Sequence, residues 1–301
     1  MDSTDRWGTG RRDTVIAALQ RAVAAHPDRI MLDFGGKTFT YSEIDRLSTA
    51  FGHALVELGV GAGDTVLSML DNNVDAVVCW LAANKLRAVS VPINTALRGE
   101  FLRHQIGDSG AGVVIAEADY APRIAAVAAE LPEMRILLHR GALGEALDMS
   151  CPVAPLDSHR GAGTDVFEAQ PDPADLAMLV YTSGTTGPSK GCMIPYNYMC
   201  NLARLQLRAG PANADDVTFT PLPLFHLNAV CVGVVATILT GSRLAVAPRF
   251  SVSGFWPEVE RSGATIASIL GGMGALLAQA GDSEEAKRCF GQIHTVRGNP
   301  F

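Results

Sequence analysis

The sequence lacks the cysteine pairs and the long apolar runs that mark several classes of protein. None of its six cysteines forms a C-x-x-C pair or stands at metal-ligand spacing from a histidine, so we expect free thiols in a reducing compartment. Residues 1–13 are polar and contain no apolar core of a signal peptide. No apolar run approaches the length of a membrane span. We therefore expect a cytoplasmic protein with no transmembrane segment.

Positive charge is scarce and scattered. The 301 residues include 24 Lys and Arg against 31 Asp and Glu, which gives a formal net charge of -7. The basic residues form no run or stripe, so there is no electrostatic reason to expect nucleic acid as a partner. Any phosphate chemistry in this chain is therefore expected to concern a small nucleotide.

Two common nucleotide-binding fingerprints are also missing. Walker A requires G-x-x-x-x-G-K-[ST], and no pair of glycines in the chain satisfies it. The dinucleotide pattern G-x-G-x-x-G fails because Gly59 and Gly61 are followed by Asp64 where the third glycine belongs. A nucleotide site in this protein must use another motif.

The most informative stretch lies at residues 176–191. An apolar run at 176–181, typical of a buried strand, is followed at 182–191 by hydroxyl residues, glycines, one proline and Lys190. Glycine lets the backbone approach an anion closely, and amides and hydroxyls can then point at it. Lysine adds a cation on a long flexible stem. This chemistry suits a polyphosphate cradle; the alternative is a solvated turn with a surface lysine.

Apolar runs of strand length alternate with helical patterns along most of the chain. This alternation predicts parallel βαβ units and an α/β fold. A hairpin is expected at 30–41 around two glycines, and residues 151–175, rich in proline and glycine, are expected to form a linker. The expected organisation is a first α/β lobe at 1–150, this linker, and a second lobe at 176–301, with mostly parallel sheets.

The order TSGTTG, followed by a lysine, resembles the phosphate-binding motif of the adenylate-forming (AMP-binding) superfamily, which includes acyl-CoA synthetases, luciferases and amino-acid-activating domains. The resemblance implies that Thr182 also ligates Mg²⁺. Pro195 and Tyr196 depart from the pattern, because relatives carry a small hydroxyl residue and a histidine there. The residues that the resemblance assigns to ATP are Thr182, Ser183, Gly184, Thr185, Thr186, Gly187 and Lys190.

A second motif, P-x-F-H at 223–226, precedes an apolar stretch at 229–239 that is expected to be a helix. A lone histidine beside a core helix is more often structural than functional. In the superfamily, however, this motif borders the acyl pocket, so the resemblance assigns Phe225 and His226 to the substrate and His226 to catalysis. Gly271 and Gly272 correspond to a stretch that lines the acyl tunnel of acyl-CoA synthetases; close helix–strand packing is the alternative.

Members of the superfamily continue beyond the end of this sequence. They carry a Y-G-x-T-E segment with a magnesium-binding glutamate, an aspartate for the ribose, a hinge, and a C-terminal domain with a catalytic lysine; the sequence contains none of these. The resemblance therefore implies the large N-terminal domain of the adenylate-forming fold, incomplete at its C-terminal end. We expect the chain to be inactive by itself and to self-associate as a homo-oligomer.

For the parent protein the resemblance implies an ATP-dependent carboxylate–CoA ligase. Its partners would be a small carboxylic acid, ATP, Mg²⁺ and CoA. Two alternatives stay open. One is an amino-acid-activating or luciferase-like adenylating enzyme, and the other is a non-catalytic remnant that binds a nucleotide or an acyl group.

Overall fold

The computed structural model describes residues 13–167, 169–182 and 188–298, and the chain divides into two compact units. Unit 1 comprises residues 1–45, 72–74 and 197–301, and unit 2 comprises residues 46–71 and 75–196. These boundaries differ from those of the two predicted lobes. The difference arises because the N-terminal strands pair with strands of the C-terminal half, whereas the strands on either side of residues 183–187 join the sheet of unit 2.

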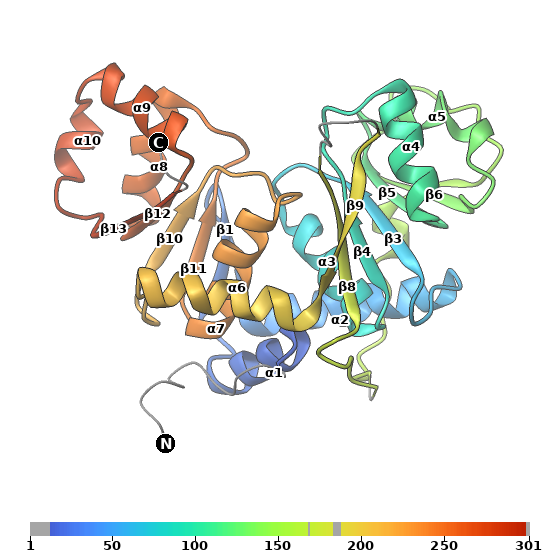
Figure 1. Ribbon diagram of the computed structural model, residues 1–301, viewed down its shortest axis with the longest axis horizontal. Coiled ribbons are helices and arrows are strands. Elements are labelled where there is room, and N and C mark those ends of the chain that lie inside the picture. The colour runs from blue at the N-terminus through green and yellow to red at the C-terminus, as the bar shows by residue number, and fades with distance from the viewer. Residues whose placement is uncertain (1–12, 168, 183–187, 299–301) are drawn as a thin grey trace. The chain divides into compact units, whose positions relative to one another are not determined.

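Unit 1 contains a six-stranded sheet in the order β13-β12-β10-β11-β1-β2 (Figure 1). Neighbouring strands are parallel except in the β1–β2 hairpin, which confirms the hairpin predicted from the sequence. Its turn uses Gly35 and Gly36, both at positive φ, and the amide of Gly36 donates to Asp33 Oδ1 over 2.8 Å. The strands of this sheet are β1 (Ile30–Phe34), β2 (Lys37–Thr40), β10 (Val217–Thr220), β11 (Arg243–Val246), β12 (Ile266–Ser268) and β13 (Thr295–Arg297).

One helix of unit 1 illustrates how its sheet is covered. Helix α8 starts at the N-cap Ser251, whose hydroxyl accepts from the amide of Gly254, and ends at Gly263 in the left-handed conformation. It buries Phe255 against Phe219 of β10, with the ring centroids 5.3 Å apart. The helices assigned to unit 1 are α1 (Val15–Ala25), α6 (Tyr196–Ala209, from its second residue), the π-helix η4 (Asn228–Val235), α7 (Ala236–Thr240), α8 (Val252–Ser262), α9 (Gly271–Ala280) and α10 (Glu284–Arg288).

Unit 2 contains a seven-stranded sheet in the order β7-β6-β5-β3-β4-β8-β9. All neighbours are parallel except β8 and β9, which form an antiparallel hairpin at one edge. The predicted α/β architecture with mostly parallel sheets is therefore confirmed. The strands are β3 (Thr65–Met69), β4 (Val89–Pro92), β5 (Val113–Glu117), β6 (Ile136–Arg140), β7 (Val153–Pro155), β8 (Leu176–Thr182) and β9 (Lys190–Pro195).

The helices of unit 2 cover this sheet with apolar side chains. In one cluster, Leu102 and Ile106 of α4 pack with Leu67, Val114 and Leu137 of the strands. Helix α3 is buried along most of its length, which is typical of a helix with apolar residues all round. The helices are α2 (Tyr41–Glu57, from Arg46 on), α3 (Val74–Lys85, from its second residue), α4 (Gly99–Ser109), α5 (Ala121–Ala125) and the short 3-10 helices η2 (Ala128–Glu130) and η3 (Leu156–His159).

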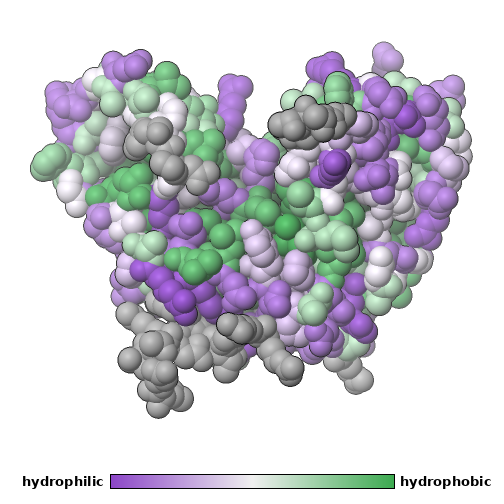
Figure 2. Space-filling model, viewed as in Figure 1, coloured by the Kyte–Doolittle hydropathy of each residue, from purple (hydrophilic) through white to green (hydrophobic). Residues whose placement is uncertain are grey.

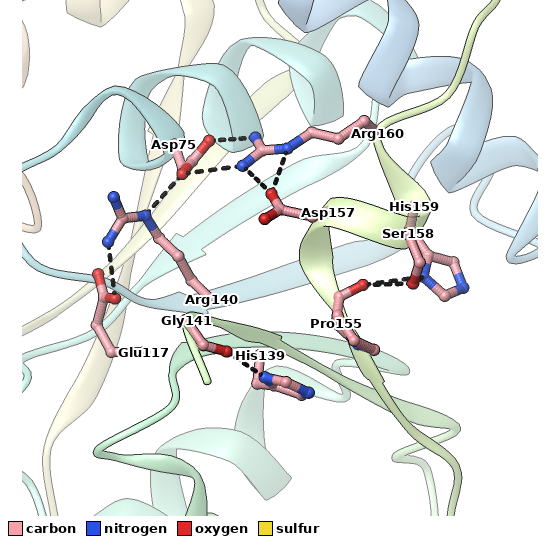
Figure 3. A network of polar contacts seen from close by, with 10 residues as sticks. All are labelled: Asp75, Glu117, His139, Arg140, Gly141, Pro155, Asp157, Ser158, His159 and Arg160. Atoms are coloured by element: carbon pink, nitrogen blue, oxygen red, sulfur yellow. Dashed lines mark hydrogen bonds and ion pairs between the residues drawn. The ribbon is translucent and has the colours of Figure 1, made fainter. Parts of the chain in front are cut away.

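The predicted linker at 151–175 contains β7 and η3 and is bound to unit 2 by ion pairs (Figure 3). Arg160 contacts both carboxylate oxygens of Asp75, which is 3% exposed, and also pairs with Asp157 at 2.7 Å. Arg140 at the end of β6 reaches the same Asp75 at 2.7 Å and Glu117 at 3.1 Å. The segment is therefore an integral part of unit 2.

Apolar and polar residues are interspersed on the face drawn in Figure 2. Several large apolar side chains are well exposed, notably Phe290 at 93%, Met193 at 70% and Phe101 at 67%. Within the described ranges, no helix is both long enough and apolar enough to cross a membrane.

Candidate functional site

Thr182 and Lys190 lie opposite each other at one end of the β8–β9 hairpin of unit 2. They are register partners in the antiparallel pair, and both side chains are exposed. The Thr182 hydroxyl lies 3.7 Å from Cys192 Sγ on the same hairpin. The other residues assigned to the phosphate loop, Ser183, Gly184, Thr185, Thr186 and Gly187, lie outside the described residues.

These two side chains offer a hydroxyl and an ammonium group from adjacent strands. The Lys190 side chain is exposed, and no acidic side chain in the described part of the chain forms an ion pair with it. A flexible cation next to a hydroxyl suits the oxygen atoms of a phosphate group. The hairpin therefore brings the two described flanks of the predicted cradle onto neighbouring strands, and the phosphate site itself stays a prediction.

Phe225 and His226 lie in unit 1, in the turn that follows β10. The His226 amide donates to the carbonyl of Pro223 over 3.1 Å, and the His226 carbonyl accepts from the amide of Val230 over 3.2 Å. The two rings are 4.7 Å apart and tilted by 55°. His226 thus links the end of a sheet strand to the start of the π-helix η4, an uncommon element that is often found at functional sites.

The electrostatics of His226 favour its neutral form. Its side chain reaches solvent, yet neighbouring protein atoms desolvate the ring and lower its pKa below the usual value of about 6.5. A neutral imidazole can donate one hydrogen bond and accept another. At neutral pH His226 is therefore suited to contact a carboxylate or adenylate through a hydrogen bond rather than through a full positive charge.

Gly271 and Gly272 are the first two residues of α9, which begins three residues after the end of β12 at Ser268. Because β10 and β12 are parallel neighbours, the His226 turn and the start of α9 leave the sheet at the same carboxyl edge, where α/β folds commonly bind ligands. A Cβ atom at Gly272 would meet no atom of the described residues within 4 Å, so packing in the described part of the chain does not require glycine there.

The side chain of Asn72 holds the His226 turn in place by hydrogen bonds. The sequence analysis did not identify this residue. Its amide group donates to the carbonyls of Leu222 at 3.0 Å and Ala247 at 2.9 Å, and its side-chain oxygen accepts from the amide of Leu224 at 2.8 Å. One side chain thus fixes the loop after β10 and the loop after β11. The sequence feature that could have identified Asn72 is the polar run 71–73, which directly follows an apolar strand.

Asn228 is a second residue that the sequence did not reveal. It begins η4 two residues after His226, and its Oδ1 atom is buried without a partner in the described part of the chain. A buried acceptor that lacks a donor is costly, and such atoms are usually satisfied by water or by a ligand. Asn228 is therefore a polar group in unit 1, next to the His226 turn, with a free acceptor atom in the described part of the chain.

The two departures from the superfamily pattern have a structural explanation. Pro195 ends β9, and Tyr196 begins α6 with its side chain fully buried. The Tyr196 hydroxyl donates to the carbonyl of Asn84 over 3.1 Å, and burial raises the pKa of this phenol. Tyr196 therefore anchors the end of the hairpin in the core of unit 2.

The predicted site residues thus form two groups in separate units. Thr182 and Lys190 come together in unit 2, and Phe225, His226, Gly271 and Gly272 share one sheet edge in unit 1. In the described part of the chain, no group of three or more His, Cys, Asp or Glu residues could hold a metal ion.

Comparison with known proteins covers nearly the whole chain. The sequence matches the family described as AMP-binding enzyme over residues 19–299. Human long-chain fatty acid transport protein 5 is 30% identical, over 95% of this chain and 42% of that protein. The medium/long-chain-fatty-acid–CoA ligase FadD6 of Mycobacterium tuberculosis is 32% identical, over 84% of this chain and 41% of that protein.

Solved structures share the fold. The N-terminal domain of FACL13 from Mycobacterium tuberculosis matches with a TM-score of 0.76 at 23% identity, over 91% of this chain and 66% of that one. The anthranilate CoA ligase AuaEII in complex with anthranoyl-AMP matches with a TM-score of 0.86 at 20% identity, over 96% of this chain and 55% of that one. The chain spans about two fifths of the length of the curated relatives named above.

Proposed function

Because the chain belongs to the AMP-binding, adenylate-forming enzyme family, we propose that it supplies the N-terminal part of an ATP-dependent carboxylate–CoA ligase. The observation that carries this proposal is the pairing of Thr182 with Lys190 at the mouth of the TSGTTG hairpin. The names of the relatives, which include fatty acid transport proteins and a fatty-acid–CoA ligase, support an apolar carboxylic acid as the substrate.

The proposed reaction has two steps. A carboxylate oxygen attacks the α-phosphorus of ATP, the bond to the pyrophosphate oxygen breaks, and acyl-adenylate and pyrophosphate result. The sulfur of CoA then attacks the acyl carbon, and AMP leaves with the electrons of the broken bond. The first step brings like charges together, so the protein must hold the reactants and stabilise charge on phosphate oxygens.

Lys190 and Thr182 would supply part of that stabilisation in unit 2. The Lys190 ammonium would pair with phosphate oxygens, and the Thr182 hydroxyl would donate to them or ligate Mg²⁺. Mg²⁺ bound with ATP would neutralise phosphate charge and keep phosphate and water oxygens as most of its ligands.

Phe225, His226, Gly271 and Gly272 would contact the carboxylic acid in unit 1. Neutral His226 would donate a hydrogen bond near the carboxylate, and Phe225 would contact its apolar part. The apolar residues of α9, none of which is buried, would be accessible to an acyl group at this edge.

The substitution Lys190→Ala tests the phosphate contact. Loss of one charge-assisted contact should weaken binding of MgATP and of pyrophosphate by about 1.5–3 kcal/mol, with little change in melting temperature because Lys190 is exposed. Titration calorimetry on the purified chain measures both affinities.

The matched control is Lys37→Ala, which removes another exposed lysine, at the β1–β2 hairpin. It should leave both affinities unchanged. If Lys190→Ala and Lys37→Ala bind MgATP equally well, Lys190 is a surface charge and the proposal loses its main support.

A further inference from the structure

Helix α4 contacts both arms of the hairpin that carries Thr182 and Lys190. On the β8 arm, the hydroxyl of Tyr181, the residue before Thr182, donates to Asp108 Oδ2 over 2.7 Å. Asp108 lies in the last turn of α4. The first arm of the predicted phosphate cradle is therefore tied to this helix immediately before the cradle begins.

The other arm is tied to the same helix through Ser189, the residue before Lys190. His104 Nε2 lies 2.8 Å from the Ser189 carbonyl oxygen, and Gln105 Nε2 donates to the Ser189 hydroxyl over 3.0 Å. Because a carbonyl can only accept, the proton of this contact belongs to His104 Nε2. Three side chains within five residues of α4 thus hold both flanks of the cradle.

The surroundings make these contacts firm. The His104 ring also meets the Tyr181 ring edge-on, with centroids 6.4 Å apart. Burial, and then the Asp108 carboxylate, raise the pKa of Tyr181, so its hydroxyl keeps its proton and remains a donor. Gln105 is only 6% exposed, so the donor that contacts the Ser189 hydroxyl is largely shielded from water.

Helix α4 is itself a rigid support. Leu102 and Ile106 are almost completely buried in the core of unit 2, and the helix ends at Gly110 in the left-handed conformation. A functional group held by a rigid element retains its geometry better than one held by a loop. The contacts of α4 with Tyr181 and Ser189 therefore restrain the β8–β9 hairpin, which lies at the edge of the sheet.

We propose that α4 is a brace for the phosphate site, and that Tyr181, Asp108, His104 and Gln105 are positioning residues for Thr182 and Lys190. This inference rests on the proposed function, because it assumes that Thr182 and Lys190 contact the phosphates of ATP. The brace fixes the separation of the two arms before the ligand arrives, so less conformational freedom is lost on binding.

A purely structural role is the alternative, in which the contacts only keep the edge strand β9 attached to the sheet. The two roles differ in what they predict. Positioning predicts that phosphate ligands bind more weakly while global stability changes little. A structural role predicts loss of stability with normal affinity in the molecules that remain folded.

The test uses Tyr181→Phe, Asp108→Ala and the double variant, with MgATP and inorganic pyrophosphate as ligands. Each single substitution should weaken both affinities roughly three- to tenfold, as expected for one lost hydrogen bond. The double variant should be no weaker than either single one, because both remove the same contact. Asp108→Asn keeps an acceptor oxygen and should bind almost as well as the unmodified chain.

Two further variants complete the design. Gln105→Met keeps the size of the side chain but removes its donor, and should also weaken both affinities. Arg103→Ala is the control: it lies on the same helix, but its guanidinium pairs with Glu100 and Glu130 rather than with the hairpin. Arg103→Ala should bind both ligands normally.

Amide hydrogen exchange at 176–182 and 189–195 separates failure of the brace from failure of the proposed function. Exchange in these segments should rise in Tyr181→Phe and Gln105→Met but not in Arg103→Ala. Unchanged exchange, or unchanged affinities with altered exchange, would overturn the brace. An unmodified chain that binds neither ligand would contradict the proposed function, while the exchange data would still decide whether α4 restrains the hairpin.

Discussion

The segment 151–175 and helix α9 are packed in the reverse of what their compositions suggest: the polar segment is well packed, and the apolar helix is exposed. The segment is polar and rich in glycine and proline, yet ion pairs and close contacts bind it to unit 2. Helix α9, GGMGALLAQA, has no charged residue, yet none of its residues is buried, and Leu276 is 49% exposed. Composition alone therefore does not say which part of this chain is packed.

Close approach explains the first region. Gly161 has φ +68, and a Cβ atom there would overlap the backbone carbonyl of Ala50 in α2. Further along, Phe167 stacks on His53 with the rings 4.6 Å apart, and His53 Nε2 lies 2.9 Å from the carbonyl oxygen of Asp165. Glycine here permits contact that a larger residue would block.

The position of α9 explains the second region. It begins beyond the carboxyl end of β12 and contacts α8. Met273 and Leu277 pack, only partly buried, against the apolar cluster of unit 1 that joins Phe255 of α8 to Phe219 and Ala267 of the sheet. An apolar helix that begins at the carboxyl edge of a parallel sheet is compatible with the acyl contact that we propose.

The largest expected effect comes from breaking the close approach in the polar segment. Gly161→Ala should destabilise the protein by at least about 3 kcal/mol, because the new Cβ meets backbone and the positive φ is strained for alanine. Urea denaturation measures the change. Gly144→Ala is the control, since φ there is not positive and a Cβ would meet nothing within 4 Å, and it should be nearly neutral. Equal stability of the two variants would mean that 160–163 does not pack on α2.

Removing the central charge of the ion pairs should have the next largest effect. Asp75→Asn leaves Arg140 and Arg160 without their shared carboxylate and should cost roughly 2–4 kcal/mol, since Asp75 is buried while both arginines reach solvent. Thermal and urea denaturation at pH 7 check the value. Glu284→Gln, which breaks an exposed pair with Lys287, should change stability by less than about 0.5 kcal/mol.

The same carboxylate predicts a pH dependence. Burial alone would raise the pKa of Asp75, but hydrogen bonds and charge from Arg160 and Arg140 outweigh it and hold the pKa below the usual value of about 3.9. Its contribution is therefore fully present above that value and is lost as the pH falls through the lower folded pKa. Stability curves of the unmodified chain and Asp75→Asn should converge as the medium becomes acidic. Curves that stay parallel down to pH 2 would contradict this assignment.

The smallest stability effect is expected in the apolar helix. Leu276→Gln should change stability by no more than about 0.5 kcal/mol, because the side chain is half exposed in the absence of ligand. If α9 lines the acyl site, the same substitution should weaken binding of a non-hydrolysable fatty-acyl adenylate analogue. A loss of stability above 2 kcal/mol would mean that α9 is a packed core helix, which would remove its contrast with the polar segment.

The sequence by itself determined many of the local elements and identified the two motifs to which we assign a site. Alternating apolar runs predicted the parallel strands, Gly35 and Gly36 predicted the β1–β2 turn, and the hydroxyl and glycine run after 176–181 marked the hairpin that carries Thr182 and Lys190. These features depend on neighbours along the chain, which is why they can be predicted from it. The predicted sites at Thr182, Lys190 and His226 remain predictions until ligands are tested.

Only the tertiary structure decided which distant residues meet. It joined β1 to β11, placed Asn72 beside Leu222 and Ala247, and set α4 against both arms of the phosphate hairpin. It also packed the glycine-rich segment and left α9 exposed. Such pairings depend on the order of strands in the sheet and on the distance between backbones. Neither can be predicted from a local pattern in a single sequence.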